Sequence, residues 1–371
     1  MTRAQRVAIA LTLAASALVA AQERPIFRSE THYIEVDAVV TDRDGRFVPG
    51  LTAADFRIRE RGRTEPVGTF AYIDLSTQTS TAAPARPVLF RPSTLTSDQV
   101  DFDRLYLIYL SPVATEYLSR ARLMAKRFVT DYLTDRDVAA VWNGEFERPL
   151  AFTNDKTALI RSIEPFMGTS IGGGRDRNVS LGGLRAAIDW MTGIQGRRKS
   201  LVLFSSGLLE GPISGMPGDT GDLRGSLMQL SSLSSSFRHN TPEFTMADLV
   251  GRSDVHVYAC DVRGLAPAPV SSQTTNLSGA ALADQVGNQY SQLSASIANL
   301  KAVADVTGGL ALINRNDYER GFQLIADDNS RYYLLGYMSH STLPRGYFVP
   351  IDVSVVRPGL RVRARQGYVT R

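Results

Sequence analysis

Hydroxyl side chains, rather than carboxylates, follow two predicted buried strands of this chain. Residues 104–110 (RLYLIYL) lead into Ser111, and residues 199–204 (KSLVLF) lead into Ser205 and Ser206. In an open α/β sheet, ligands bind at the carboxyl ends of such strands. A divalent metal there requires hard oxygen ligands, above all Asp or Glu. Because neutral hydroxyls should not hold a strongly hydrated Mg²⁺ against water, we predict no metal and no other cofactor at these strand ends.

The elements that would position these serines alternate between strand and helix over residues 104–328. This alternation predicts a Rossmann-like, doubly wound parallel sheet of the α/β class. In the first helix, residues 116–133, Leu118, Ala121 and Ala125 fall at helical spacing, so one face packs on the sheet. Further strands are expected at residues 138–142, 149–152, 255–260 and 310–313, and further helices at residues 181–191, 293–306 and 318–326.

Two polar stretches, residues 208–244 and 266–291, interrupt this alternation. Both follow the carboxyl end of a strand, so both belong to the face that would bind a ligand. Long loops in a compact domain are either functional or disordered, and the sequence leaves both readings open.

Alternating apolar and polar residues predict strands at both ends of the chain. Residues 30–75 are typical of a β-meander that is too short to be stable alone. Residues 329–371 contain further strand-like runs that could complete it. We therefore predict a small β-sandwich from both termini, with residues 104–328 inserted and residues 76–103 as a Ser-, Thr- and Pro-rich linker. Two separate β-caps are the alternative.

Residues 1–21 are typical of a secretory signal peptide. Arg3 and Arg6 precede an apolar run, residues 7–19, and small residues follow it. An uncleaved membrane anchor is the alternative, but the run is short for a span, and no second stretch is long enough. The formal charge is only +4, and the leader carries two of these charges. That balance predicts no nucleic-acid partner.

Signals for an enzyme are weak. The four histidines, His32, His239, His256 and His340, are scattered without metal-ligand spacing. The chain has no S-x-x-K motif. A serine nucleophile would need a nearby histidine base. The single cysteine, Cys260, lies in an apolar run and reads as a small buried hydrophobe, with a reactive thiol as the alternative.

Three separated segments carry a resemblance to a known family. They are residues 39–58 (VVTDRDGRFVPGLTAADFRI), residues 307–337 (TGGLALINRNDYERGFQLIADDNSRYYLLGY) and residues 357–368 (RPGLRVRARQGY). Their order resembles that of the von Willebrand factor A (VWFA)-related domain proteins of the acidobacterial type, which are secreted. The resemblance implies that residues 104–328 form a von Willebrand A domain.

Many domains of this type hold a metal through a D-x-S-x-S motif, a threonine loop and a further aspartate. The resemblance puts Tyr109 at the first aspartate, Ser111 and Val113 at the two serines, and Ser206 at the last aspartate. Ser180 is the candidate for the threonine. The resemblance therefore implies a degenerate metal-dependent adhesion site. A rescue through Asp176 or Asp261 is the alternative.

We accordingly predict a secreted, non-catalytic module that binds another protein and is exported to the periplasm, the cell envelope or the outside. The loops at residues 111–115, 172–180, 205–211 and 261–265 would form the adhesive face. The alternatives are a serine-type hydrolase using Ser206 or Ser111 and a purely structural component of the cell envelope. The candidate ligand-face residues are Ser111, Arg175, Arg177, Ser180, Ser206 and Asp261.

Overall fold

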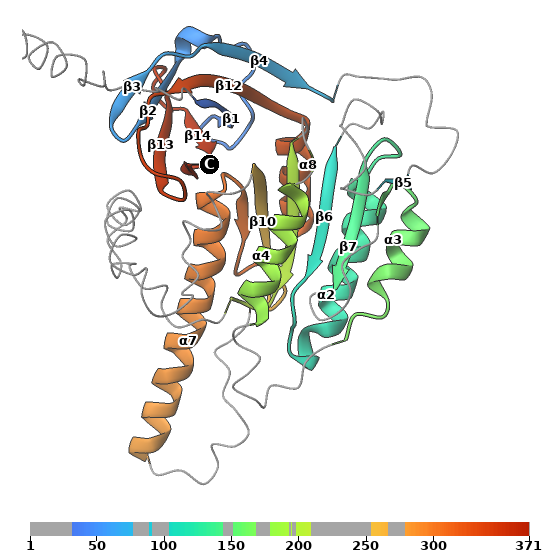
Figure 1. Cartoon of the computed structure of the whole chain (residues 1–371). Coiled ribbons are helices and arrows are strands. Elements are labelled where there is room, and N and C mark those ends of the chain that lie inside the picture. Colours follow the sequence, from blue (N-terminus) through green and yellow to red (C-terminus); the bar gives the residue numbers. More distant parts are fainter. Residues whose placement is uncertain are drawn as a thin grey trace, which may run out of the picture.

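Three β-sheets and five α-helices make up the part of the chain that the computed structural model describes (Figure 1). That part comprises residues 32–76, 89–90, 104–143, 151–167, 179–192, 194, 198–208, 254–265 and 279–370. One sheet has seven strands and two have four. No helix in these ranges combines the length and apolar character that crossing a bilayer requires.

The seven-stranded sheet has the order β11-β10-β9-β6-β7-β8-β5. Neighbours from β11 to β7 are parallel, and β8 and β5 add antiparallel pairs at one edge. Counted from β6, the order reads 3-2-1-4-5-6, that of a doubly wound fold, whose switch point lies between β6 and β9. The predicted α/β sheet with parallel strands is therefore confirmed. The strands are β5 (Leu89–Phe90), β6 (Leu105–Leu110), β7 (Val138–Asn143), β8 (Phe152–Thr153), β9 (Lys199–Ser205), β10 (Val255–Asp261) and β11 (Leu310–Leu312).

Helices cover both faces of this sheet because its central strands are buried on both sides. On one face, α2 (Thr115–Arg127), a π-helical turn (Phe128–Tyr132), α3 (Lys156–Ile163) and α8 (Glu319–Ser330) enclose one apolar cluster. On the other face, α4 (Val179–Thr192) and α7 (Gly279–Val306) enclose a second. The sheet is thus the middle of three layers.

Helix α7 begins earlier than the sequence predicts. We expected a loop over residues 266–291, but the helix starts at Gly279 (Figure 1). Its first half, GAALADQVGNQYSQ, contains Ala, Leu and Gln, which favour a helix intrinsically. It lacks the clear apolar stripe on which the prediction relied.

Strands from both ends of the chain pair with each other in the two four-stranded sheets, drawn in blue and red in Figure 1. One sheet has the order β14-β1-β12-β4 and the other β15-β13-β2-β3, and all the pairs are antiparallel. Residues of both sheets share one apolar cluster. The strands are β1 (His32–Thr41), β2 (Phe56–Glu60), β3 (Arg63–Glu65), β4 (Thr69–Asp74), β12 (Arg331–Ser339), β13 (Phe348–Val355), β14 (Arg361–Ala364) and β15 (Gly367–Val369).

The expectation of a β-meander over residues 30–75 is wrong. Strands β1 and β2 belong to different sheets, and each pairs with strands from the other end of the chain. The chain that crosses between them is held by Tyr333 of β12, whose hydroxyl accepts from the Leu51 amide at 3.2 Å and donates to the Val48 carbonyl at 2.8 Å. Alternation along a strand shows which face is buried, and it does not show which strand lies beside it.

Buried charges connect the small sheets to the amino ends of the parallel strands. Asp37 of β1 contacts His256 of β10 at 3.1 Å and Arg198 at 3.4 Å. Arg198 also donates to the Tyr258 hydroxyl at 3.2 Å and lies over the Tyr332 ring. Burial, together with the charge of Arg198, lowers the pKa of His256. Burial alone would raise the pKa of Asp37, but the hydrogen bond with His256 and the charge of Arg198 outweigh it and lower that pKa.

The folded protein should therefore be less stable in mild acid. His256 binds a proton more readily once unfolded, so the free energy of unfolding should fall as pH drops below its ordinary pKa of 6.5. The slope should approach about 1.4 kcal/mol per pH unit. Asp37 should add a further loss below its ordinary pKa of 3.8. Urea unfolding of the wild type and His256→Gln between about pH 7.5 and pH 5.5 checks this.

The control is Arg57→Gln, an exposed change on β2 away from the His256–Asp37 pair. The control should keep the wild-type slope, whereas His256→Gln should flatten it. Equal slopes in the wild type and His256→Gln would contradict the assignment.

Candidate functional site

The carboxyl ends of three neighbouring strands meet at the switch point of the parallel sheet. Leu110 of β6 pairs with Phe204 of β9, and Ser205 pairs with Asp261 of β10. The Ser111 amide continues the ladder by donating to the Phe204 carbonyl at 3.0 Å. Ser111, Ser205 and Asp261 therefore lie side by side in one row across the place where doubly wound sheets bind their ligands.

This row faces the layer formed by α4 and α7. The residues two positions earlier, Tyr109, Leu203 and Ala259, pack in the apolar cluster on that face, and side chains two apart in a strand share a face. The Ser205 hydroxyl is bonded within its own turn to Gly207. The buried Ser111 hydroxyl has no hydrogen-bond partner in the described part of the chain. The row is polar, enclosed and only partly satisfied.

Arg263 neutralises the one carboxylate of this row. Its Nε donates to Asp261 Oδ1 at 2.8 Å and its Nη2 to Oδ2 at 2.7 Å, a bidentate pair. The Arg263 amide donates to the same Oδ1 at 3.0 Å, and Nη1 donates to the Ser296 hydroxyl of α7 at 2.8 Å. The side chains of Arg263 and Asp261 are only 8% and 2% exposed, respectively. A guanidinium thus supplies the positive charge next to Asp261.

Residues from α2 and from the loop before α8 hold the turn that carries Arg263. Arg120 of α2 donates to the Arg263 carbonyl at 3.3 Å and to Asn316 at 2.8 Å, and Asn316 also accepts from the Leu265 amide. Gly264 between them has a φ of +73°, and a Cβ there would overlap the Arg120 guanidinium. The turn therefore requires glycine on two counts.

A metal does not fit Asp261 as it is placed. Both carboxylate oxygens are occupied by Arg263, whose positive charge also opposes a cation at short range. Within the residues that the structure describes, no three His, Cys, Asp or Glu side chains are grouped so that they could hold an ion. Asp176, the other residue considered for a rescue, lies outside the described residues.

The other predicted site residues fall into three groups. Tyr109 and Val113 are buried in the apolar clusters on opposite faces of the sheet, and burial raises the pKa of the Tyr109 hydroxyl. Ser206 is half-buried beside the row. Ser180 lies in α4, but its side chain is outside the described part, as are Arg175 and Arg177.

Arg263 was not among the predicted site residues. The signal that could have identified it is the Asp261-Val262-Arg263 spacing directly after a buried strand, because a turn there brings the two charges together. Ser296 gave no such signal, since its place beside Arg263 depends on how α7 packs against β10.

Comparison with known proteins gives only distant structural likenesses. No protein-family model matches the chain, and no curated protein does. An aerotolerance-related membrane protein from Bacteroides fragilis is 13% identical over 61% of this chain and 98% of its own, with a TM-score of 0.30. BatB from Bacteroides thetaiotaomicron is 13% identical over 61% of this chain and 96% of its own, with a TM-score of 0.30. The vWF domain of the type V pili tip protein Mfa5 from Porphyromonas gingivalis is 19% identical over 39% of this chain and 55% of its own, with a TM-score of 0.24. TM-scores this low define neither the fold nor the function of this chain.

Removing Arg263 should destabilise the protein strongly, because Asp261 would become a buried charge without a partner. We expect Arg263→Met to lower the free energy of unfolding by about 3–5 kcal/mol. The double variant Asp261→Asn with Arg263→Met should recover more than half of this loss, since no buried charge remains. Urea unfolding of the wild type, both single variants and the double variant measures the coupling. Additive losses would show that the pair does not act as a unit.

Proposed function

We propose that the chain is a secreted, non-catalytic module that binds another protein through the carboxyl ends of its parallel strands. In this proposal, residues 104–328 are a von Willebrand A-type domain of the acidobacterial kind. Residues 1–21 direct export to the periplasm, the cell envelope or the outside. The strand order of the large sheet and its switch point support the proposal.

The Asp261–Arg263 pair carries the proposal. Adhesion sites that depend on metal use an ion to present positive charge to a partner's carboxylate. Here the nearest positive charge belongs to a guanidinium that is already bound to Asp261 on both oxygens. The proposed face therefore works without a metal, as a degenerate adhesion site.

The proposed face offers a partner hydroxyl groups and apolar surface. Ser206 is half-buried, and Leu265, in the turn after β10, is 57% exposed. Ser111 and the Asp261–Arg263 pair lie beneath as a rigid base. In the proposal, Ser180, Arg175 and Arg177 extend the face and take a partner's acidic groups, because the arginine fork matches a carboxylate.

The two four-stranded sheets would serve as a β-sandwich that supports the binding domain. Its strands come from residues 30–75 and 329–371, so the domain inserted between them would be held at both of its ends. Partly buried ion pairs at this junction, such as Arg363 with Asp328 at 2.6 and 2.7 Å, favour a fixed orientation. The platform would leave the opposite, carboxyl-end face open for binding.

A serine hydrolase is less well supported. Ser111 is buried, and His256 lies level with Ser200, five residues before Ser205, which is about 16 Å along the strand. The imidazole of His256 is also engaged by Asp37. His239 lies outside the described residues. A purely structural role is the other alternative, and it predicts no partner for the proposed face.

Cross-linking to proteins of the source cell's envelope tests the proposal. The full chain should capture a partner equally well with and without EDTA. Ser206→Arg should reduce capture at least tenfold, because a long charged side chain at the centre of an interface blocks close packing. Arg57→Gln, an exposed change on β2, is the control and should leave capture unchanged.

Loss of capture in EDTA would contradict a metal-free face. Capture that survives Ser206→Arg but is lost in Arg57→Gln would place the binding surface on the small sheets. No capture under any condition would favour the structural role.

A further inference from the structure

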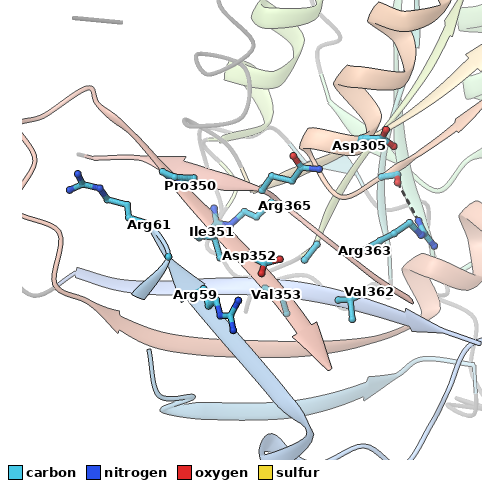
Figure 2. A pocket seen from close by; sticks show the side chains of 14 residues that line it. Arg59, Arg61, Asp305, Pro350, Ile351, Asp352, Val353, Val362, Arg363 and Arg365 are labelled. Carbon is cyan, nitrogen blue, oxygen red and sulfur yellow. Dashed lines mark hydrogen bonds between the residues drawn. The ribbon is translucent and has the colours of Figure 1, made fainter. Parts of the chain in front are cut away.

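A second candidate site lies at the other end of the parallel sheet, where the small sheets meet the amino end of β11. A cavity of about 390 Å³ opens there between β2, β13, the end of β14 and the end of α7 (Figure 2). This volume lies within the range of small-molecule sites. The cavity is separate from the serine row, because Gly309 in its wall precedes β11 whereas Ser111 follows β6.

Two arginines of the cavity form no ion pair in the described part of the chain, although an aspartate, Asp352, lies opposite one of them in the sheet. Arg59 and Arg61 are exposed, and neither makes an ion pair or hydrogen bond with another side chain in the described part of the chain. Arg363, a third arginine of the wall, differs because Asp328 holds it at 2.6 and 2.7 Å. It also donates to the Gly309 carbonyl at 3.3 Å (Figure 2). Arg365, the fourth arginine of the wall, donates to the Glu35 carbonyl. The positive charge available to a ligand therefore comes mainly from β2 and the turn after it.

The backbone fixes where these two arginines lie. Arg59 is the cross-strand partner of Asp352 on β13, so its stem lies along the cavity wall. Arg61 follows at the β2–β3 turn with a φ of +50°, a conformation that few non-glycine residues adopt. Gly62, also in the wall, continues the turn with a φ of +83°. The turn thus sets the second guanidinium at the rim.

Part of the wall is apolar and reachable. Pro350, Val353 and Val362 line the cavity and are half-buried, unlike the fully enclosed residues of the neighbouring core. Two acidic side chains belong to the wall as well: Asp352 lies beside Arg59, and Asp305, at the end of α7, lies on the far wall (Figure 2). Burial raises the pKa of the Asp305 carboxyl group, so its repulsion of an anion is weaker than that of an exposed aspartate.

We propose that this cavity binds a monocarboxylate with an apolar body, its carboxylate on Arg59 and Arg61 and its body against Pro350, which lies on the same face of the sheet. The planar guanidinium suits a carboxylate, and the apolar wall suits a short aliphatic chain. Two sources share this chemistry: a free short-chain acid, and the chain end of a polypeptide whose last residue is apolar.

Calorimetric titration of the full chain tests the proposal and separates the sources. The probes are hexanoate, hexanamide, and the peptide acetyl-Ala-Ala-Leu as its free acid and as its amide. At least one acid should bind, and its amide should bind at least tenfold more weakly because the charge-assisted bonds are lost. Binding of hexanoate would identify a small acid, and binding of the peptide acid alone would identify a chain end.

Variants assign the binding to this cavity. Arg59→Gln and Arg61→Gln should each weaken the acid about tenfold, whereas Asp305→Asn should bind it at least as tightly. Arg57→Gln is the matched control, because Arg57 is on the same strand and exposed but does not line the cavity. Absence of binding by both acids, equal binding of acid and amide, or an equal loss in Arg57→Gln would overturn the proposal.

Discussion

An ionised carboxylate that is buried against apolar strands needs a positive partner, and this requirement shapes both ends of the parallel sheet. At the carboxyl end, Asp261 is held by Arg263 through two direct bonds. At the amino end, Asp37 is held by Arg198 and His256. Removing one member of such a pair costs far more than the pair itself contributes, because the remaining charge has no water to solvate it. The two ends of the sheet therefore differ in role. The carboxyl end presents an enclosed polar face, and the amino end joins the small sheets to the large one.

Pairing of the two chain ends explains how the molecule is organised. Strand β1 lies between β14 and β12, and β2 lies beside β13, so neither small sheet can form from one end of the chain alone. The apolar cluster that they share draws on both ends as well. Residues near the end of α7 and near β14 then meet, since the Gln366 amide donates to the Val306 carbonyl at 3.0 Å. The cavity proposed to bind a carboxylate is a consequence of this junction.

Sequence patterns predicted the parts that depend on local order. Continuous apolar runs identified β6, β9 and β10, and the structure places Ser111, Ser205 and Asp261 side by side at the ends of these strands. The patterns could not show that Arg263 binds Asp261, because that pairing depends on a turn held by Arg120 from another element. They also could not divide β1 and β2 between two sheets, since alternation specifies a buried face and not a neighbour. The prediction began helix α7 too late because the first half of the helix has a helix-favouring composition but no apolar stripe.

The central claim is that the face at the carboxyl ends of β6, β9 and β10 works without a metal because Arg263 occupies Asp261. Thermal unfolding of the full chain with and without millimolar Mg²⁺, Mn²⁺ or Ca²⁺ tests it most directly. An ion at about 100 times its dissociation constant would add about 2.7 kcal/mol to the free energy of unfolding and raise the midpoint by several degrees. We predict no shift with any of the three ions. A clear rise that is selective for one ion would contradict the claim and would mean that carboxylates outside the Asp261–Arg263 pair form a metal site.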